Sequence, residues 1–215
     1  MKDLAAAKSR LELPAEAAPA KAALVLAMLA DTIAAARRAR RVDGVTVVTP
    51  DVIVARQARV CGASVLLEPR SQSLNDSLAW ALSARADDSP AAVLLADLPC
   101  LQHWELDRAL REAGSQPVVC SDRDGAGTVF LSFGSQHGPT THFGADSFVR
   151  HVEAGFCPLR GAMPGLRHDV DTYSSLLAAR MLGMGPATSR WFEARLPWCR
   201  HSHPIRSTGP VRLSS

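Results

Sequence analysis

Three aspartates whose spacing suits metal binding stand near the ends of two predicted strands. Asp97 directly follows the apolar run 93–96, and Asp169 and Asp171 lie at the end of the segment 166–170 and just beyond it. Because side chains alternate along an extended chain, these last two carboxylates project from the same face. Three convergent carboxylates supply the hard oxygen ligands that Mg²⁺ prefers and shares with substrate phosphates.

Helix capping is the alternative role for these aspartates. Asp171 precedes a helix predicted to begin at Thr172, and Asp97 precedes another, and Asp is a favoured N-cap residue. Either aspartate alone would more often be a cap than a ligand. The D-x-D pair together with the strand-end Asp97 favours a Mg²⁺ site, with Asp97, Asp169 and Asp171 as its ligands.

Two glycine-containing loops have features of phosphate binding. The loop D-R-D-G-A-G-T, residues 122–128, follows a predicted strand, and its glycines would let backbone N–H groups approach an anion. The segment F-G-A-D-S, residues 143–147, opens a predicted helix, whose free N–H groups favour a phosphate or carboxylate. The chain lacks the P-loop and the dinucleotide fingerprint, which argues against a standard NTPase or dehydrogenase.

Basic residues near the N-terminus, Lys2, Lys8 and Arg10, suggest a contact for a triphosphate. In a loop after a strand they would stabilise the charge of a leaving pyrophosphate, whereas on a helix they would form a solvated basic face. A second basic run, residues 37–41, closes a predicted helix, where positive charge complements the helix dipole. That arrangement favours a solvated helix end over a nucleic-acid patch.

The elements that must position these residues alternate along the chain. Helices are predicted over residues 20–40, 52–60, 75–84, 104–113, 146–154 and 172–182, and strands over 45–49, 64–67, 91–96, 117–120, 128–133 and 166–170. This alternation predicts an α/β domain with a mostly parallel sheet and helices on both faces. In such sheets, ligands gather outside the carboxyl ends of the strands, where Asp97 is expected.

Composition predicts an ordinary globular protein. The chain has 215 residues, 47% of them hydrophobic and 21% charged, with a formal net charge of +3. No uninterrupted apolar run approaches the roughly 20 residues of a membrane span, and the charged N-terminus is unlike a signal peptide. The five cysteines show no C-x-x-C spacing, and Cys199, His201 and His203 lack a fourth zinc ligand. We therefore expect a cytoplasmic protein with no membrane or nucleic-acid partner.

The order of the motifs resembles one family closely. K-x-L-x-x-A-K-S-R-L, T-P-D, L-N, D-L-P-x-L, D-R-x-G-x-G-T, F-G-x-D-S-x-x-x-H and P-G-L-R-x-D-V-D-T follow one another as in the 2-phospho-L-lactate or phosphoenolpyruvate guanylyltransferases of coenzyme F-420 biosynthesis. The resemblance runs from Lys2 to about Thr188. It implies the three-layer nucleotidyltransferase fold of the nucleotide-diphospho-sugar transferases, with GTP as donor, Mg²⁺ as cofactor and either phosphoenolpyruvate or 2-phospho-L-lactate as acceptor.

The resemblance also implies roles for individual residues. The metal ligands are Asp97, Asp169 and Asp171, which we count as catalytic together with Lys8; the acceptor would contact Thr128, Gly144 and Ser147, and the triphosphate Lys2, Lys8 and Arg10. Asn75 either faces the nucleoside or caps its helix. Arg123 and His151 match family positions without an assigned role. A phosphate oxygen of the acceptor then attacks the α-phosphorus of GTP in line, which needs positioning rather than a general base.

One departure from the family concerns the first strand. Relatives begin with an apolar strand that leads into the basic loop, and here nothing precedes Met1-Lys2, so we expect that this strand is missing from the sequence through misassignment of the start codon. We place the nucleotidyltransferase domain at residues 1–188 and a largely disordered extension at 189–215. The alternatives are another nucleotidyltransferase of the same fold, of molybdenum-cofactor or sugar-nucleotide type, and an inactive nucleotide-binding module. The sequence does not determine the oligomeric state, and a homodimer is one candidate.

Overall fold

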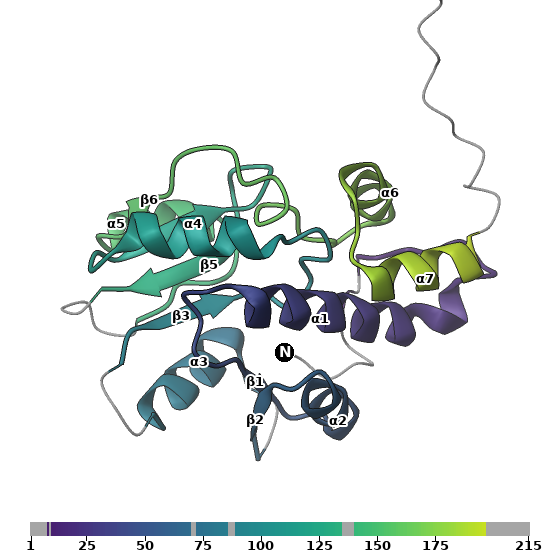
Figure 1. The fold of residues 1–215 in the computed structure, drawn as a ribbon, viewed down its shortest axis with the longest axis horizontal. Helices are drawn as coiled ribbons and strands as arrows, with labels where there is room; N and C mark the ends of the chain where they lie inside the picture. Colours follow the sequence, from purple (N-terminus) through teal and green to yellow (C-terminus); the bar gives the residue numbers. More distant parts are fainter. Residues whose placement is uncertain (1–7, 9, 70–71, 86–88, 135–139, 197–215) are drawn as a thin grey trace, which may run out of the picture.

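The computed structural model describes residues 8, 10–69, 72–85, 89–134 and 140–196 (Figure 1). The predictions for Lys2, for a strand before the basic loop and for the tail from residue 197 onwards therefore lie outside the described residues. The described helices are η1 (Ala18–Ala20), α1 (Lys21–Arg38), α2 (Val52–Val60), α3 (Leu74–Ser83), α4 (His103–Ala113), α5 (Ser147–Glu153), α6 (Tyr173–Leu182) and α7 (Pro186–Arg195).

The described strands form two sheets. β1 (Thr46–Thr49) pairs in parallel with β2 (Ser64–Leu67), and a four-stranded sheet has the order β3-β5-β4-β6. Its strands are β3 (Ala91–Leu94), β4 (Val118–Ser121), β5 (Thr128–Phe133) and β6 (Cys157–Pro158).

The α/β class is confirmed, but the four-stranded sheet is mixed rather than mostly parallel. β4 runs parallel to β6, whereas β5 runs antiparallel to both β3 and β4. The reason is that the short loop 122–127 joins β4 directly to β5. A parallel connection would need a crossover of a dozen or more residues.

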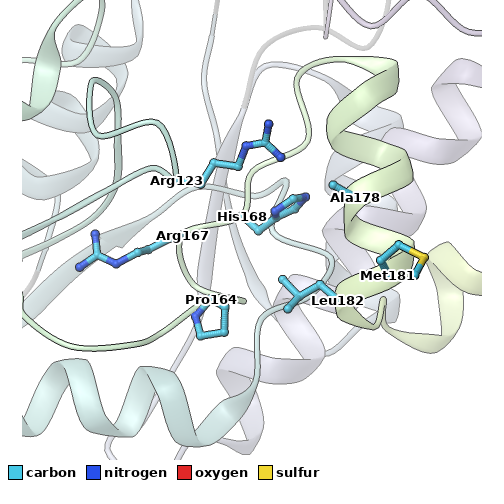
Figure 2. A pocket seen from close by; sticks show the side chains of 7 residues that line it. All are labelled: Arg123, Pro164, Arg167, His168, Ala178, Met181 and Leu182. Atoms are coloured by element: carbon cyan, nitrogen blue, oxygen red, sulfur yellow. The ribbon is translucent and has the colours of Figure 1, made fainter. Parts of the chain in front are cut away.

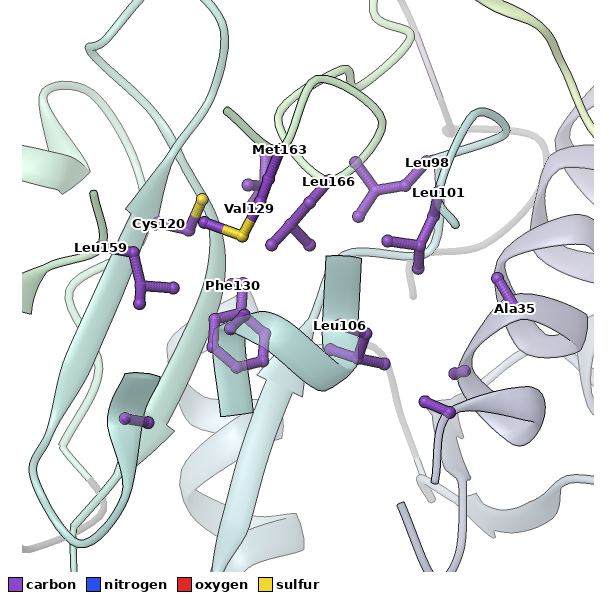
Figure 3. Close-up of a cluster of buried hydrophobic side chains, with 14 of the residues drawn as sticks. Ala35, Leu98, Leu101, Leu106, Cys120, Val129, Phe130, Leu159, Met163 and Leu166 are labelled. Atoms are coloured by element: carbon purple, nitrogen blue, oxygen red, sulfur yellow. The ribbon is translucent and has the colours of Figure 1, made fainter. Parts of the chain in front are cut away.

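Helices cover both faces of the larger sheet. Phe130 and Cys120 pack with α1 and α4 on one face (Figure 3). Leu131 and Val119, the immediate neighbours of Phe130 and Cys120 in the same strands, pack with α3 and α5 on the other face. This alternation follows from the two-residue repeat of a strand. Because both faces are covered, every residue of β4 and β5 is buried, which makes the sheet a rigid support for the loops at its edge.

Helix α1 is the central packing element. Its length and apolar composition over Ala18–Arg38 would allow a membrane span, but nine of its residues are buried inside the domain. Leu24, Val25 and Met28 belong to the same hydrophobic cluster as buried residues of α6 and α7. Leu29 and Ile33 belong to another cluster, with residues of α2 and β1. We interpret α1 as a core helix because its apolar surface is used for packing.

Helix α7 was not predicted, and it corrects the domain boundary after residue 188. Trp191, Phe192 and Leu196 are buried against α1 and α6, so the folded domain continues at least to Leu196. The start of α7 is held by Asp31 of α1, whose two carboxylate oxygens accept the backbone N–H groups of Ala187 and Thr188 at 2.9 and 2.7 Å. The sequence P-A-T-S-R at the start of this helix did not lead to its prediction, although proline at the first position of a helix is a recognised start signal.

The strand predicted over 166–170 is also absent from the structure. Residues 164–167 form a turn, and residues 168–171 continue as an irregular segment. Buried Glu105 of α4 holds this turn, because one of its oxygens accepts the N–H of Gly165 at 2.8 Å while the other accepts that of Gln102 at 3.0 Å. The apolar residues Leu166 and Val170 are buried as predicted, but they fill the core from a loop.

Candidate active site

The antiparallel pairing of β3 and β5 brings the predicted site residues to one edge of the sheet. The N–H of Leu95 donates to the carbonyl of Val129 at 3.0 Å, so the chain leaving β3 towards Asp97 passes the start of β5 at Thr128. The N–H of Val170 donates to the carbonyl of Asp97 at 3.1 Å. This bond places the D-V-D segment beside Asp97 although it is not a strand.

Lys8 lies at the centre of this group. Its Nζ forms ion pairs with Asp97 Oδ2 and, at 2.5 Å, with Asp171 Oδ1, and Arg10 pairs with the other oxygen of Asp171. Burial acts to lower the pKa of Lys8, but the two carboxylates outweigh it, and the pKa is raised overall. Lys8 is therefore a permanent positive charge that joins the N-terminal segment to two of the predicted metal ligands.

The third predicted ligand, Asp169, is disfavoured in its charged form by these surroundings. Burial, followed by repulsion from Asp97 and Asp171, raises the pKa of Asp169 to about 7, and Lys8 opposes this rise. The second oxygen of Asp97, Oδ1, is buried and has no hydrogen-bond partner among the described residues. A buried carboxylate oxygen without a partner is unfavourable unless a cation or donor reaches it.

Neither capping role explains these aspartates. Helix α6 is capped by Thr172, in a capping box with Ser175, and helix α4 is capped by Gln102 in a box with Glu105. Asp171 and Asp97 therefore do not cap these helices, and their carboxylates pair with Lys8 instead.

The described residues nevertheless contain no group of three or more His, Cys, Asp or Glu side chains arranged to hold a metal ion. The ammonium group of Lys8 lies between Asp97 and Asp171, at the place where their shared cation would be expected. The donor set itself fits Mg²⁺, because it consists of carboxylates and includes the unpartnered Asp97 oxygen. The predicted Mg²⁺ site thus stays a prediction, and binding would require Lys8 to move aside.

The loop 122–128 differs from the predicted phosphate nest. The N–H groups of Ala126 and Gly127 already donate to the carboxylate of Asp122, at 3.0 and 2.8 Å. A side chain at Gly127 would lie 2.4 Å from that carboxylate, so glycine is needed there for the close approach of the chain's own anion. Sequence reasoning missed this role of Asp122, although an aspartate opening a D-x-x-G turn is a frequent capping pattern.

Thr128, the first residue of β5, is linked to α5 through His151. Its Oγ1 lies 3.0 Å from His151 Nδ1, while the N–H of His142 donates to His151 Nε2 at 2.9 Å. Thr128 and Ser147 are 3% and 2% exposed, and His151 is fully buried. Gly144 has φ of 134°, a conformation that favours glycine. The predicted acceptor residues Thr128, Gly144 and Ser147 therefore come together around the start of α5.

Asn75 does not cap its helix, and its predicted contact with the nucleoside stays a prediction. The cap of α3 is Ser73, and the amide of Asn75 instead holds the segment before Gly144. Its Oδ1 accepts from Thr141 Oγ1 at 2.9 Å and from the N–H of Phe143 at 2.8 Å, and its Nδ2 donates to the Phe143 carbonyl at 3.0 Å. Through these three hydrogen bonds, Asn75 fixes the segment before Gly144, which belongs to the predicted acceptor site.

An open pocket of about 560 Å³ adjoins the D-V-D segment (Figure 2). Arg167 and His168 line it, but both also support the fold: Arg167 donates to Ser121 and to the carbonyl of Leu159, and His168 Nε2 lies 2.8 Å from the Ser175 carbonyl. Arg123 lines the same pocket with its side chain 43% exposed, and its one ion pair with a described residue is to the exposed Asp124 at 3.3 Å. Arg123 is therefore the basic group of this pocket that is freest to meet a ligand.

Comparisons with known proteins identify the fold and the family. A crystal structure described as a putative nucleotide-diphospho-sugar transferase from Desulfovibrio desulfuricans G20 superposes with a TM-score of 0.66 at 16% identity, covering 92% of this chain and 94% of the other. The fold is therefore that of the nucleotide-diphospho-sugar transferases, as predicted.

Sequence relatives define the family within that fold. The family described as "Guanylyl transferase CofC like" matches residues 1–159. The phosphoenolpyruvate guanylyltransferase of Mycobacterium marinum is 44% identical over 197 residues, covering 88% of this chain and 89% of the relative. The enzyme of the same name from Mycolicibacterium gilvum is 45% identical over 201 residues, covering 90% and 92%. The chain belongs to the CofC-like guanylyltransferase family.

Proposed function

We propose that this protein transfers the guanylyl group of GTP to the phosphate of phosphoenolpyruvate and releases pyrophosphate, as a step of coenzyme F-420 biosynthesis. The observation that carries the proposal is the 44–45% identity to phosphoenolpyruvate guanylyltransferases over about nine-tenths of both chains. The cluster of Lys8, Asp97, Asp169 and Asp171 supports it, because it brings together the charged groups of both signs that binding of a triphosphate and its cation would need.

The protein contributes little covalent chemistry to this reaction. A phosphate oxygen of the acceptor forms a bond to the α-phosphorus of GTP, and the bond from that phosphorus to the bridging oxygen of pyrophosphate breaks. The attacking phosphate is already a dianion, so no general base is required, and catalysis depends on alignment and charge neutralisation.

The basic and the acidic residues of the site have different proposed roles in this reaction. Lys8 and the largely exposed Arg10 would contact the triphosphate once it draws them from Asp97 and Asp171. Asp97, Asp169 and Asp171 would hold Mg²⁺, which supplies positive charge to the reacting and leaving phosphate oxygens. Thr128, Gly144 and Ser147 would bind the acceptor, and the loop held by Asn75 would keep them in place.

The test is direct. The protein is incubated with GTP and Mg²⁺ together with phosphoenolpyruvate, 2-phospho-L-lactate or 3-phosphoglycerate in parallel, and pyrophosphate release is followed, with Asp97→Asn as the inactive control. We expect release with phosphoenolpyruvate. Release only with another acceptor would reassign the substrate, and GTP binding without release would favour the inactive module. A preference for CTP or ATP would indicate another nucleotidyltransferase.

A further inference from the structure

His151 is a buried polar side chain beside the predicted acceptor site, and the proposed mechanism gives it no role. It is fully buried and surrounded by aromatic rings, with ring centroids 5.2 Å from Phe143, 5.5 Å from Phe156 and 5.7 Å from His142. Such an environment disfavours a charged imidazolium. Burial lowers the pKa of His151 to about 4, against the opposing effect of the Ser147 carbonyl and with further lowering by His142 and Arg150. The ring is therefore neutral at physiological pH.

The hydrogen bonds also determine which ring nitrogen carries the proton. The backbone N–H of His142 can only donate, so His151 Nε2, 2.9 Å away, must accept and carries no hydrogen. A neutral imidazole has one N–H, which must then be on Nδ1. Nδ1 faces Thr128 Oγ1 at 3.0 Å, so His151 donates to Thr128 and not the reverse.

This assignment leaves the hydrogen of the Thr128 hydroxyl without an acceptor in the described part of the chain. His151 Nδ1 is a donor, and it is the one side-chain partner of the hydroxyl among the described residues. Thr128 is 3% exposed, and a buried hydroxyl donor left unpaired is unfavourable. An anionic ligand group that reaches the hydroxyl would remove this cost, and the phosphate and carboxylate of the acceptor are such groups.

We propose that His151 is a positioning residue: by donating to Thr128 Oγ1, it forces the Thr128 hydroxyl to donate its own hydrogen to the anionic acceptor substrate. This role rests on the proposed function, because the acceptor is the ligand that would complete the bond. A hydroxyl whose orientation is set before binding loses no rotational freedom when the substrate arrives. His151 thereby selects for a hydrogen-bond acceptor at this place in the site.

Three substitutions separate the hydrogen bond from the packing. His151→Phe keeps an aromatic ring among Phe143 and Phe156 but removes both hydrogen bonds, whereas His151→Asn retains an amide N–H near the Nδ1 position. We expect His151→Phe to raise the KM for phosphoenolpyruvate about 10- to 100-fold with the KM for GTP unchanged, and His151→Asn to recover most of the loss. Phe156→Leu is the packing control and should lower the melting temperature without this selective change.

A double-mutant cycle with Thr128→Val shows whether His151 acts through the Thr128 hydroxyl or whether the two substitutions impair the site independently. If His151 acts through the hydroxyl, the double variant His151→Phe/Thr128→Val is no worse than Thr128→Val alone. Losses that multiply, or equal rises in the KM for both substrates, would overturn the proposal. So would a folded His151→Phe variant with an unchanged KM for phosphoenolpyruvate.

Failure of the proposed function would be recognised separately, as a wild-type protein that releases no pyrophosphate with any acceptor. In that case, titration calorimetry with phosphoenolpyruvate alone compares its binding to wild type and to His151→Phe, and equal or absent binding would refute the positioning role. Nitrogen-15 NMR of the histidine rings tests the tautomer without any substrate. A proton on Nε2 of His151 would refute the proposal at its first step.

Discussion

Replacing Asp169 by asparagine should make the protein more stable and inactive. In the folded protein the pKa of Asp169 is raised from 3.8 to about 7 by burial and by its neighbours Asp97 and Asp171. At about 1.4 kcal/mol per pH unit, this rise corresponds to about 4 kcal/mol. None of the causes of the shift is a hydrogen bond, so asparagine removes the charge without leaving a partner unpaired.

The sign of the effect follows from linkage between protonation and folding. Since the pKa is higher in the folded state, the protonated carboxyl favours folding, and its contribution is complete below about pH 4 and lost as the pH rises through about 7. Wild type and Asp169→Asn should therefore have the same free energy of unfolding near pH 4. At pH 8 the variant should be more stable, by up to about 4 kcal/mol.

Urea denaturation at pH 4, 6 and 8 in the presence of EDTA measures this difference. Asp124→Asn is the matched control, because that aspartate is 76% exposed and its replacement should change stability by less than about 0.5 kcal/mol. Excess Mg²⁺ at pH 8 should stabilise wild type but not Asp169→Asn, if Asp169 is a ligand. A variant that is equal to or less stable than wild type at pH 8 would refute the reasoning.

Three further substitutions test the supports of the site. Glu105→Ala should lower the free energy of unfolding by about 3 kcal/mol, because two backbone N–H groups lose a buried carboxylate; a loss no larger than that of Glu105→Gln in urea denaturation would contradict this. Asp31→Ala should cost about 2–3 kcal/mol and expose α7 to proteolysis before the rest of the domain, whereas uniform protection would argue against the role of Asp31 as its anchor. Asn75→Ala should cost about 2 kcal/mol and raise the KM for the acceptor several-fold, measured by pyrophosphate release, and an equal rise for GTP would show that the effect is not local.

Local pattern was sufficient to predict most elements of the fold. The prediction included β1 to β5 and α1 to α6. A strand buried on both faces is a continuous apolar run, and a helix buried on one face has apolar residues at regular spacing, so both can be recognised in the sequence. Where burial follows no repeat, the prediction failed. Leu166 and Val170 are buried from a loop that Glu105 holds, and α7 is anchored by a carboxylate of α1. Neither arrangement produces a repeat of apolar residues, and the proline at the start of α7 is a local signal that the prediction did not use.

The candidate site, like the fold, could be predicted from the sequence only in part. From its sequence alone the chain reveals which groups could do chemistry, since Asp97, Asp169, Asp171, Lys8 and Thr128 stand in recognisable motifs. Only the tertiary structure decided how they are used: Lys8 pairs with two of the aspartates, Asp122 fills the loop expected to hold phosphate, and His151 sets the orientation of Thr128. The physical reason is that a hydrogen bond or an ion pair depends on distances of about 3 Å between residues remote in sequence, and local pattern carries no information about such distances.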